Sequence, residues 1–353
     1  MAKLQTKNVK ISGVCGALPR TVKTVYEVGE GFFDEPEIRK ITLPIGVGNL
    51  YFAEEGQTAS DLCYVAAERL IDGLGWQREE IDGLIFVSQT PDYIAPATSC
   101  LLQDRLGLST GCFAFDMNFG CSAFVSAYFL AANLIDTGAC SKVLLLIGDT
   151  LRRYVSPEDK GLTFIISDAG TATALERSTE GVLSSVIMST DGSGSDALIV
   201  PAGGARMPMD SDTGIVSYDD DGNGRSSEDF YMDGMAVFTF AVKRVPALID
   251  ELAELHGMDK ADFEYFLLHQ ANAYMLKFIA KRSRLPLEKF PVNIGRYGNT
   301  NGSTIPLLIC DLASKELSMP KDVIMSGFGV GLSWGGVATS LGGLAYAGIV
   351  AVE

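Results

Sequence analysis

Apolar positions along the chain alternate between two periods. Short apolar runs typical of buried strands are separated by longer segments in which apolar residues recur every three or four positions. The expected strands cover residues 9–16, 83–90, 112–117, 143–149 and 171–176, and the expected helices cover 59–75 and 122–138. Strands that alternate with helices predict parallel strands joined by crossover helices. The chain is therefore expected to be an α/β protein.

The same order of segments recurs later in the chain, which raises the hypothesis of an internal duplication. Two pairs of segments share a pattern, residues 78–90 with 260–272 and residues 168–176 with 334–344. Short apolar strands also resemble one another by chance, so these pairs alone leave the question open. A duplication would divide the chain into the halves 1–177 and 178–353. The carboxyl ends of their central strands would then meet at one ligand site.

Residues 323–352 contain no charged residue and are long enough for a membrane span. Glycines interrupt the segment throughout, which favours two buried strands joined by a glycine turn. We therefore expect no membrane span there. Residues 1–13 lack the apolar stretch of a secretory signal.

Charge and cysteine content argue against several classes of protein. The formal net charge of −16 opposes binding to nucleic acid or to anionic membrane surfaces. The seven cysteines show neither CxxC nor CxxH spacing, which argues against a metal site or a disulfide framework. We therefore expect a cytoplasmic protein with no metal.

Cys121 is the cysteine whose surroundings indicate reactivity. Residues 113–135 predict a buried strand, a tight turn at 118–120 and a helix that begins at or just after Cys121. The free N–H groups and partial positive charge of a helix N-terminus favour a thiolate, so a lowered thiol pKa is expected. The alternative is a buried core cysteine, which is the expectation for most of the other cysteines.

A reactive cysteine needs a base or an electrostatic partner, and the chain has two histidines, His256 and His269. His256 lies at a polar helix end before a glycine, where a solvated role is expected. His269 ends the apolar strand 263–269, which would aim it into the crevice above the sheet. A core histidine would give the same pattern.

Asn299 follows Gly298 in a turn that precedes another helix. Alone it would be a turn or cap residue, whereas an amide donor near His269 would stabilise an enolate oxygen. The glycine cluster 326–336 lacks the helix and acidic partner of a dinucleotide site and instead predicts close backbone approach. A main-chain N–H there, together with that of Cys121, would hold a thioester oxygen.

Four motifs resemble those of β-ketoacyl-acyl-carrier-protein synthase III in order and spacing: NFGCSAF at 118–124, HQAN at 269–272, YGNT at 297–300 and GFGVGLSWGG at 327–336. The resemblance covers nearly the whole chain. It implies a thiolase-like fold, in which two pseudo-symmetric βαβαβαββ halves form a five-layered α-β-α-β-α core. It also implies a homodimer with a sheet that continues across the two-fold axis. Elongating ketosynthases, with two histidines, and thiolases, with two cysteines, are less similar.

The resemblance also implies a reaction. Cys121 would accept an acyl group from acyl-coenzyme A, and His269 with Asn299 would bind the carbonyl of malonyl-acyl carrier protein during decarboxylation. Carbon–carbon bond formation would follow, in fatty-acid initiation or in a specialised fatty-acid or polyketide-type pathway. Backbone N–H groups of Cys121 and Val330 would form the oxyanion hole. No tightly bound cofactor is expected.

The resemblance places further residues along the substrate path. Lys160 matches a contact to the coenzyme A phosphates, and Gly234, Phe238 and Asn272 match the pantetheine tunnel. Residues 32–49 lack the Trp and Arg-rich pattern that holds the adenine end of coenzyme A in the family. Coenzyme A is therefore held differently, or the acyl donor is another carrier. Ala95 stands where the dimer partner often inserts a bulky Phe into the acyl pocket, which favours a longer or branched acyl chain.

A carrier protein is acidic, so its docking surface should be basic. The segment 273–284 carries Lys277, Lys281 and Arg284 at spacings that place them on one helix face, with Arg282 adjacent. Tyr274 replaces an arginine common in the family. An ordinary solvated helix face would have the same composition.

Two other functions stay open at the level of sequence. A non-condensing acyltransferase would use the same three residues to form an ester or amide. A catalytically silent subunit would pair with an active homologue, but the intact Cys121, His269 and Asn299 argue against it.

Overall fold

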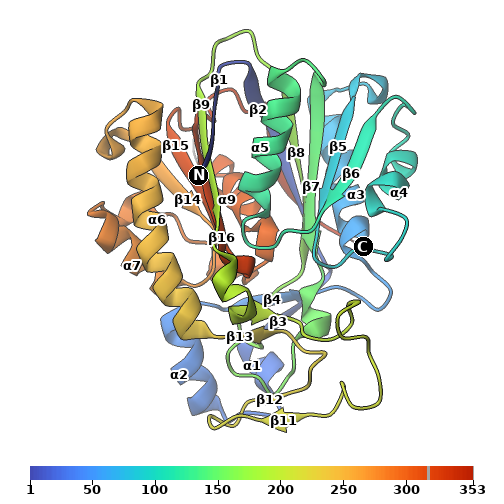
Figure 1. The fold of residues 1–353 in the computed structure, drawn as a ribbon, viewed down its shortest axis with the longest axis vertical. Helices are drawn as coiled ribbons and strands as arrows, with labels where there is room; N and C mark the ends of the chain where they lie inside the picture. The colour runs from blue at the N-terminus through green and yellow to red at the C-terminus, as the bar shows by residue number, and fades with distance from the viewer. Residues whose placement is uncertain (316–318, 353) are drawn as a thin grey trace.

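The computed structural model describes residues 1–315 and 319–352, and two large β-sheets form its framework (Figure 1). One sheet has the strand order β17 (Tyr346–Ala351), β2 (Val9–Leu18), β8 (Ala169–Arg177), β7 (Lys142–Asp149), β5 (Gly83–Val87) and β6 (Phe113–Met117). The other has the order β1 (Ala2–Thr6), β9 (Ser184–Thr190), β16 (Ser333–Thr339), β15 (Val323–Gly329) and β14 (Tyr265–Leu268).

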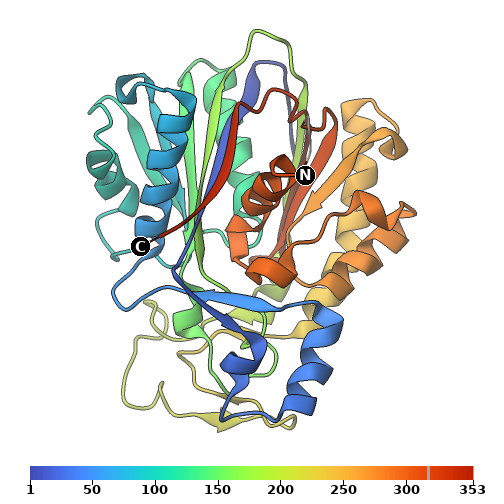
Figure 2. The same cartoon turned by 180° about the vertical axis from the view of Figure 1, so that it is seen from behind.

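Helices complete five layers. Helices α5 (Ala123–Asp136) and α9 (Thr304–Ala313) lie between the two sheets and contact both. Helix α3 (Ala59–Leu74) covers the outer face of the first sheet, and α6 (Gly234–His256) covers the outer face of the second (Figures 1 and 2). Helix α4 (Thr98–Arg105) packs on β5 and β6, and α7 (Ala273–Ser283) packs beside α6. This α-β-α-β-α arrangement confirms the predicted thiolase-like fold.

The two sheets repeat one arrangement. In the first, β2, β8 and β7 are successively antiparallel and β5 is parallel to β7. In the second, β9, β16 and β15 are successively antiparallel and β14 is parallel to β15. The segment pairs that suggested a duplication therefore occupy matching positions, with β5 corresponding to β14 and β8 to β16.

The terminal strands cross between the halves. Strand β1 pairs with β9 in the second sheet, and β17 runs parallel to β2 in the first. Strand β8 ends at Arg177, where the sequence suggested a boundary, and each half is completed by a strand from the opposite end of the chain. Short-range patterns carry no information on this exchange, because it depends only on pairing between distant segments.

The central helices are buried around most of their circumference. In α5 the buried residues include Phe124, Val125 and Tyr128, and in α9 only the last residue, Ala313, is not fully buried. A helix that is apolar on all sides requires cover on all sides, which explains why these two helices lie between the sheets rather than outside them.

A smaller lobe lies below the sheets (Figures 1 and 2). It contains the hairpin of β3 (Thr21–Thr24) and β4 (Asn49–Phe52), the helices α1 (Val25–Gly29), α2 (Glu35–Ile45) and α8 (Ile294–Tyr297), and the short pairs β10 (Leu198–Ile199) with β13 (Tyr231–Met232) and β11 (Ser217–Tyr218) with β12 (Gly224–Arg225). Its own core joins Val25, Ile38 and Leu50 to Phe164 of the main body. The lobe thereby covers the lower end of both sheets.

The uncharged C-terminal segment forms β15 and β16, joined through a turn in which Gly331 has a φ of 71°, and then β17. The prediction of buried strands joined by a glycine turn is confirmed. Within residues 1–315 and 319–352, no helix is both long and apolar enough to cross a membrane.

Candidate active site

A cavity lies where the carboxyl ends of strands from both sheets meet. Cys121, His269 and Asn299 all line it, so the structure brings together the three residues that the sequence singled out. Its remaining walls are mostly apolar: Leu151, Leu162, Ile165, Ile166, Leu198, Phe230, Met232, Val237, Ala271, Met275 and Phe328, with Asn272, Asn301 and Gly329. An enclosed, mostly apolar site with a few polar groups is typical of a pocket for a small molecule.

Cys121 follows the turn that leaves β6, and α5 begins two residues later at Ala123. The N–H of Ala123 donates to the carbonyl oxygen of Gly120 at 2.8 Å and closes this turn. Strand β15 presses against it: a β-carbon at Gly327 would lie 2.8 Å from the Cys121 carbonyl oxygen, and one at Gly329 would lie 2.6 Å from the sulfur. The glycine cluster thus serves close backbone approach, as predicted.

The predicted lowering of the Cys121 pKa is wrong. Burial raises the pKa of this thiol to about 11, and the nearby charge of Asp149 adds to the increase. Hydrogen bonding from the backbone of Val330 and of Cys121 itself acts in the opposite direction but does not offset burial. The resting group is therefore a neutral thiol, which needs a base to become a nucleophile.

His269 is held in one orientation and one protonation state. Its backbone N–H donates to Ser326 at 2.8 Å, and Phe328 contacts the ring edge-on at 5.6 Å. The hydroxyl of Thr304 donates to the Asn301 carbonyl at 2.9 Å, so it accepts a hydrogen bond from Nδ1 of His269, 2.8 Å away. Nδ1 therefore carries the proton, and the lone pair of Nε2 is left for the cavity.

Burial also sets the charge of His269. It lowers the pKa of the imidazole from 6.5 to about 4, so the ring is neutral at pH 7. A neutral imidazole with a free Nε2 lone pair can take the proton of a neutral thiol.

Asn299 is oriented by its own turn. Its backbone N–H donates to Ile165 at 2.8 Å, and its carbonyl accepts from Ser167 at 3.0 Å. The side-chain oxygen Oδ1 accepts from the N–H of Asn301 at 2.9 Å. Since Oδ1 is engaged with the backbone, the Nδ2 amide is the group of Asn299 that is available as a donor to a substrate oxygen.

The two backbone groups that the sequence predicts as oxyanion donors lie close to the Cys121 sulfur. Val330 follows Gly329 at the end of β15, and its backbone interacts with the Cys121 thiol. Two main-chain N–H groups, those of Cys121 and Val330, therefore lie beside the atom that would carry the acyl group.

The residues expected along the substrate path lie in different places. Asn272 lines the cavity, and its side chain accepts from the N–H of Met275 at 2.7 Å. Gly234 begins α6 in open space, and Phe238 packs against Tyr274 with ring centroids 5.8 Å apart. Lys160 pairs with Glu37 at 2.9 Å, so a bound phosphate would compete with this ion pair.

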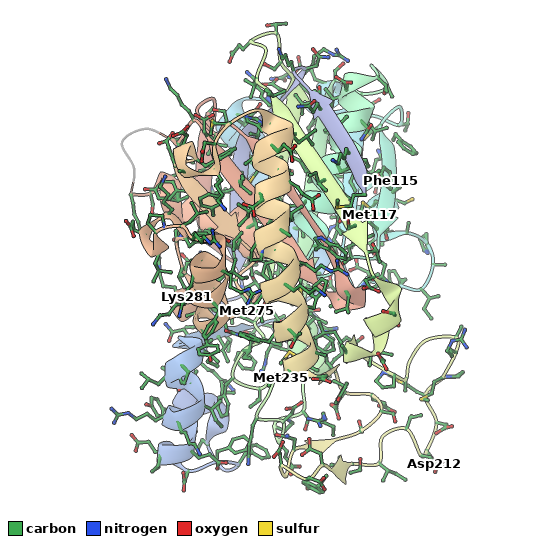
Figure 3. All side chains as sticks on the ribbon, turned by 60° about the vertical axis from the view of Figure 1, so that its left-hand side comes forward. Phe115, Met117, Asp212, Met235, Met275 and Lys281 are labelled. Atoms are coloured by element: carbon green, nitrogen blue, oxygen red, sulfur yellow. The ribbon has the colours of Figure 1, made fainter. Side chains whose placement is uncertain are left out.

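The expected gate and docking residues lie on the surface. Ala95 is exposed on the loop between β5 and α4 and does not line the cavity of this chain. Lys277, Lys281, Arg282 and Arg284 are exposed, and Lys281 projects outward on α7 (Figure 3). Helix α7 ends at Ser283 and Arg284 caps it with a φ of 58°, so Arg284 does not continue the predicted helix face.

A polar group that the sequence patterns did not single out lies beside the three site residues. Asn301, Thr304, Asp149 and Gln89 form hydrogen bonds that connect the two halves at the site. A signal was present, because Gln89 and Asp149 stand at the carboxyl ends of predicted strands, where α/β proteins place ligand sites. Within the described residues, no group of three or more His, Cys, Asp or Glu side chains could hold a metal ion.

The five-layered fold and the Cys, His and Asn site define an enzyme of the thiolase superfamily with a condensing-enzyme active site. The family profiles described as 3-oxoacyl-[acyl-carrier-protein] synthase III and its C-terminal part match residues 115–192 and 253–341. A Campylobacter jejuni protein provisionally named 3-oxoacyl-[acyl-carrier-protein] synthase 3 is 33% identical over 341 residues, 94% of each chain.

Solved structures agree with these matches. The 3-oxoacyl-(acyl-carrier protein) synthase of Burkholderia xenovorans has a TM-score of 0.92 and 40% identity over 99% of each chain. The synthase III of Pseudomonas aeruginosa has a TM-score of 0.80 and 25% identity, covering 94% of this chain and 98% of the other. This chain belongs to the 3-oxoacyl-[acyl-carrier-protein] synthase III family and is an acyltransferase-type condensing enzyme.

Proposed function

We propose that this enzyme transfers an acyl group from acyl-coenzyme A to Cys121 and condenses it with malonyl-acyl carrier protein. The products are a 3-oxoacyl-carrier protein, carbon dioxide and free coenzyme A. The observation that carries the proposal is the shared cavity, in which a neutral thiol, a neutral imidazole with a free Nε2 and an amide donor meet. Family membership supports the same reaction.

In the loading step, Nε2 of His269 takes the thiol proton of Cys121 while the sulfur attacks the thioester carbonyl. The N–H groups of Cys121 and Val330 hold the resulting oxyanion. The carbon–sulfur bond to coenzyme A breaks, and the departing thiolate takes from His269 the proton that came from Cys121. The imidazole is then neutral again, as its lowered pKa requires.

In the condensation step, the malonyl thioester loses carbon dioxide and becomes an enolate. Nε2 of His269, which takes a proton from solvent as the negative charge develops beside it, and Nδ2–H of Asn299 donate to its oxygen. The enolate carbon attacks the acyl carbonyl on Cys121, and the carbon–sulfur bond to the enzyme breaks. The cysteine sulfur recovers its proton from His269, which restores the resting site.

The acyl chain that fits this site is longer or branched. A second hollow adjoins the cavity and shares Leu151, Leu198 and Phe230 with it. Gln89 and Asn118 also line this hollow, which lies toward the end of β6. Ala95 would leave room at this end of the pocket if a second protomer contributed its loop.

The proposed assembly is a homodimer. Strand β6 is an edge of its sheet, Phe113 on it is 56% exposed, and Ile94 in the loop between β5 and α4 is fully exposed. An exposed apolar edge strand is a surface suited to pairing with a second copy.

The carrier protein would dock on the basic surface of α7. The use of coenzyme A and carrier-protein substrates is consistent with a cytoplasmic location.

Mass spectrometry and carbon dioxide release test the proposed function together. The protein is incubated with a panel of acyl-coenzyme A donors, acylation of Cys121 is measured, and malonyl-acyl carrier protein is then added. Acylation followed by carbon dioxide release is the expected result. Acylation without decarboxylation would indicate a non-condensing transferase, and absence of acylation would indicate a silent subunit.

A further inference from the structure

Asp149 is a buried carboxylate at the end of β7, only 1% exposed. One of its oxygens, Oδ1, accepts hydrogen bonds from the N–H of Gln89 at 2.7 Å and from the hydroxyl of Ser88 at 3.1 Å. A buried carboxylate is costly unless such donors compensate its lost hydration. Asp149 has no role in the reaction steps above, so its placement needs another explanation.

The other oxygen of Asp149 reaches across to the second half of the chain. Oδ2 accepts from Nδ2 of Asn301 at 2.8 Å, and the same amide lies 3.2 Å from the side-chain oxygen of Gln89. Asn301 has a φ of 53°, a left-handed conformation that few residues other than glycine adopt. A side chain pinned from the opposite half holds the backbone in this conformation.

The backbone of Asn301 in turn contacts the partners of both condensing residues. Its N–H donates to Oδ1 of Asn299 at 2.9 Å, and its carbonyl accepts from Thr304, which accepts from Nδ1 of His269. We propose that Asp149 is a positioning residue: through Asn301 it fixes the turn 299–304, and so orients the Asn299 amide and selects the His269 tautomer.

The ionised form of Asp149 is the one that fits these contacts. Gln89 and Asn301 both present N–H donors to it, and a protonated oxygen would face one of them without an acceptor. Burial nevertheless raises the pKa of this carboxyl to about 7, and the charge of Asp168 contributes to the increase. Among the described residues, the thiols of Cys63 and Cys121 also interact with it electrostatically. Protonation of Asp149 below pH 7 would weaken its hydrogen bond to Asn301.

The inference rests on the proposed function, because that function gives Asn299 and His269 their roles. The link from Asp149 through Asn301 to His269 can nevertheless be measured without substrate. The chain has two histidines, so the ¹⁵N spectrum of the labelled protein resolves each imidazole. In the wild type at pH 8, His269 should show a protonated Nδ1. Asp149→Asn should give a mixture of tautomers at His269 and leave His256 unchanged.

Kinetics provide the second measurement. Asp149→Asn should lower the kcat for carbon dioxide release about 100-fold through misplacement of the donors, with KM for the malonyl substrate changed much less. In the wild type, kcat should fall as the pH drops below about 7, and the variant should lack this dependence. For kcat at pH 8, Asp168→Asn is the matched control, because this buried carboxyl accepts from Ala53 and Arg152 instead.

Asn301→Ala removes the other partner of the hydrogen bond between Asp149 and Asn301. It is measured in the same way if Asp149→Asn does not fold. The double variant should be no worse than the more impaired single variant, because the two residues act through one contact. Additive losses, an unchanged His269 tautomer, or a pH dependence that persists in both single variants would each overturn the proposal. A wild-type protein that releases no carbon dioxide would refute the proposed function while leaving the spectroscopic test intact.

Discussion

Gly329 lies so close to Cys121 that a β-carbon at residue 329 would stand 2.6 Å from the sulfur. Gly329 also has a φ of 153°, which residues with a side chain rarely adopt. The end of β15 therefore shapes the space around the nucleophile.

Gly329→Ala should abolish acyl loading, because the methyl group would displace the sulfur or the oxyanion donor at Val330. The expected loss is at least about 100-fold in the loading rate, measured by mass spectrometry of Cys121. Gly343→Ala is the matched control, since nothing lies within 4 Å of a β-carbon there. Normal loading in Gly329→Ala would show that the sulfur does not need this close contact.

His269→Ala should slow loading as well as condensation, because the Cys121 thiol is neutral and needs a base. Without the imidazole, the loading rate should rise about tenfold per pH unit as solvent takes over deprotonation, up to a pH of about 11. Cys121→Ala should not load at any pH. Rapid, pH-independent loading by His269→Ala would mean that the thiol is already ionised and that burial does not control its pKa.

Asn299→Asp should spare loading and impair decarboxylation. The replacement keeps the oxygen that accepts from Asn301 and exchanges the Nδ2 donor for an acceptor. Loss of one oxyanion donor costs about 100- to 1,000-fold in kcat, measured as carbon dioxide release from the acylated enzyme. Asn299→Ala, which removes both contacts, should in addition lower the melting temperature. An equal loss of loading in Asn299→Asp would place Asn299 in the first step instead.

Acidification should destabilise the protein through His269. Its pKa falls from 6.5 in the unfolded chain to about 4 in the folded one, so the unfolded state binds a proton first as pH decreases. Stability is fully retained above pH 6.5 and decreases toward pH 4, by about 3 kcal/mol. Urea unfolding of the wild type and of His269→Gln should differ by this pH dependence. His256→Gln is the control, because His256 is less buried and the pKa of its imidazole is lowered less.

Charge reversal on α7 should weaken carrier-protein use without affecting loading from coenzyme A. Lys277→Glu together with Lys281→Glu should raise the KM for malonyl-acyl carrier protein, most strongly at low salt. Lys3→Glu on β1 is the control, an exposed lysine outside this helix. An unchanged KM would place the carrier on another face. A parallel loss of loading would indicate that these lysines also bind coenzyme A.

Much of the fold was predictable from local patterns. The alternation of strands and helices, the matched strand pairs and the buried C-terminal strands all follow from apolar periodicity and glycine placement, which are properties of short segments. Cys121, His269 and Asn299 could be named because each stands where a strand or turn meets a loop, and because four motifs resemble one family.

Tertiary structure decided what short segments do not encode. The pKa of Cys121 rises because its surroundings, which include the distant strand β15, desolvate the sulfur, and the local strand-turn-helix pattern does not reveal this. The link from Asp149 to Asn301 joins residues 152 positions apart. Arg284 leaves the helix face because the chain adopts a left-handed cap there. The sequence by itself determined which elements and reactive groups exist, whereas packing between distant segments determined their charge, orientation and partners.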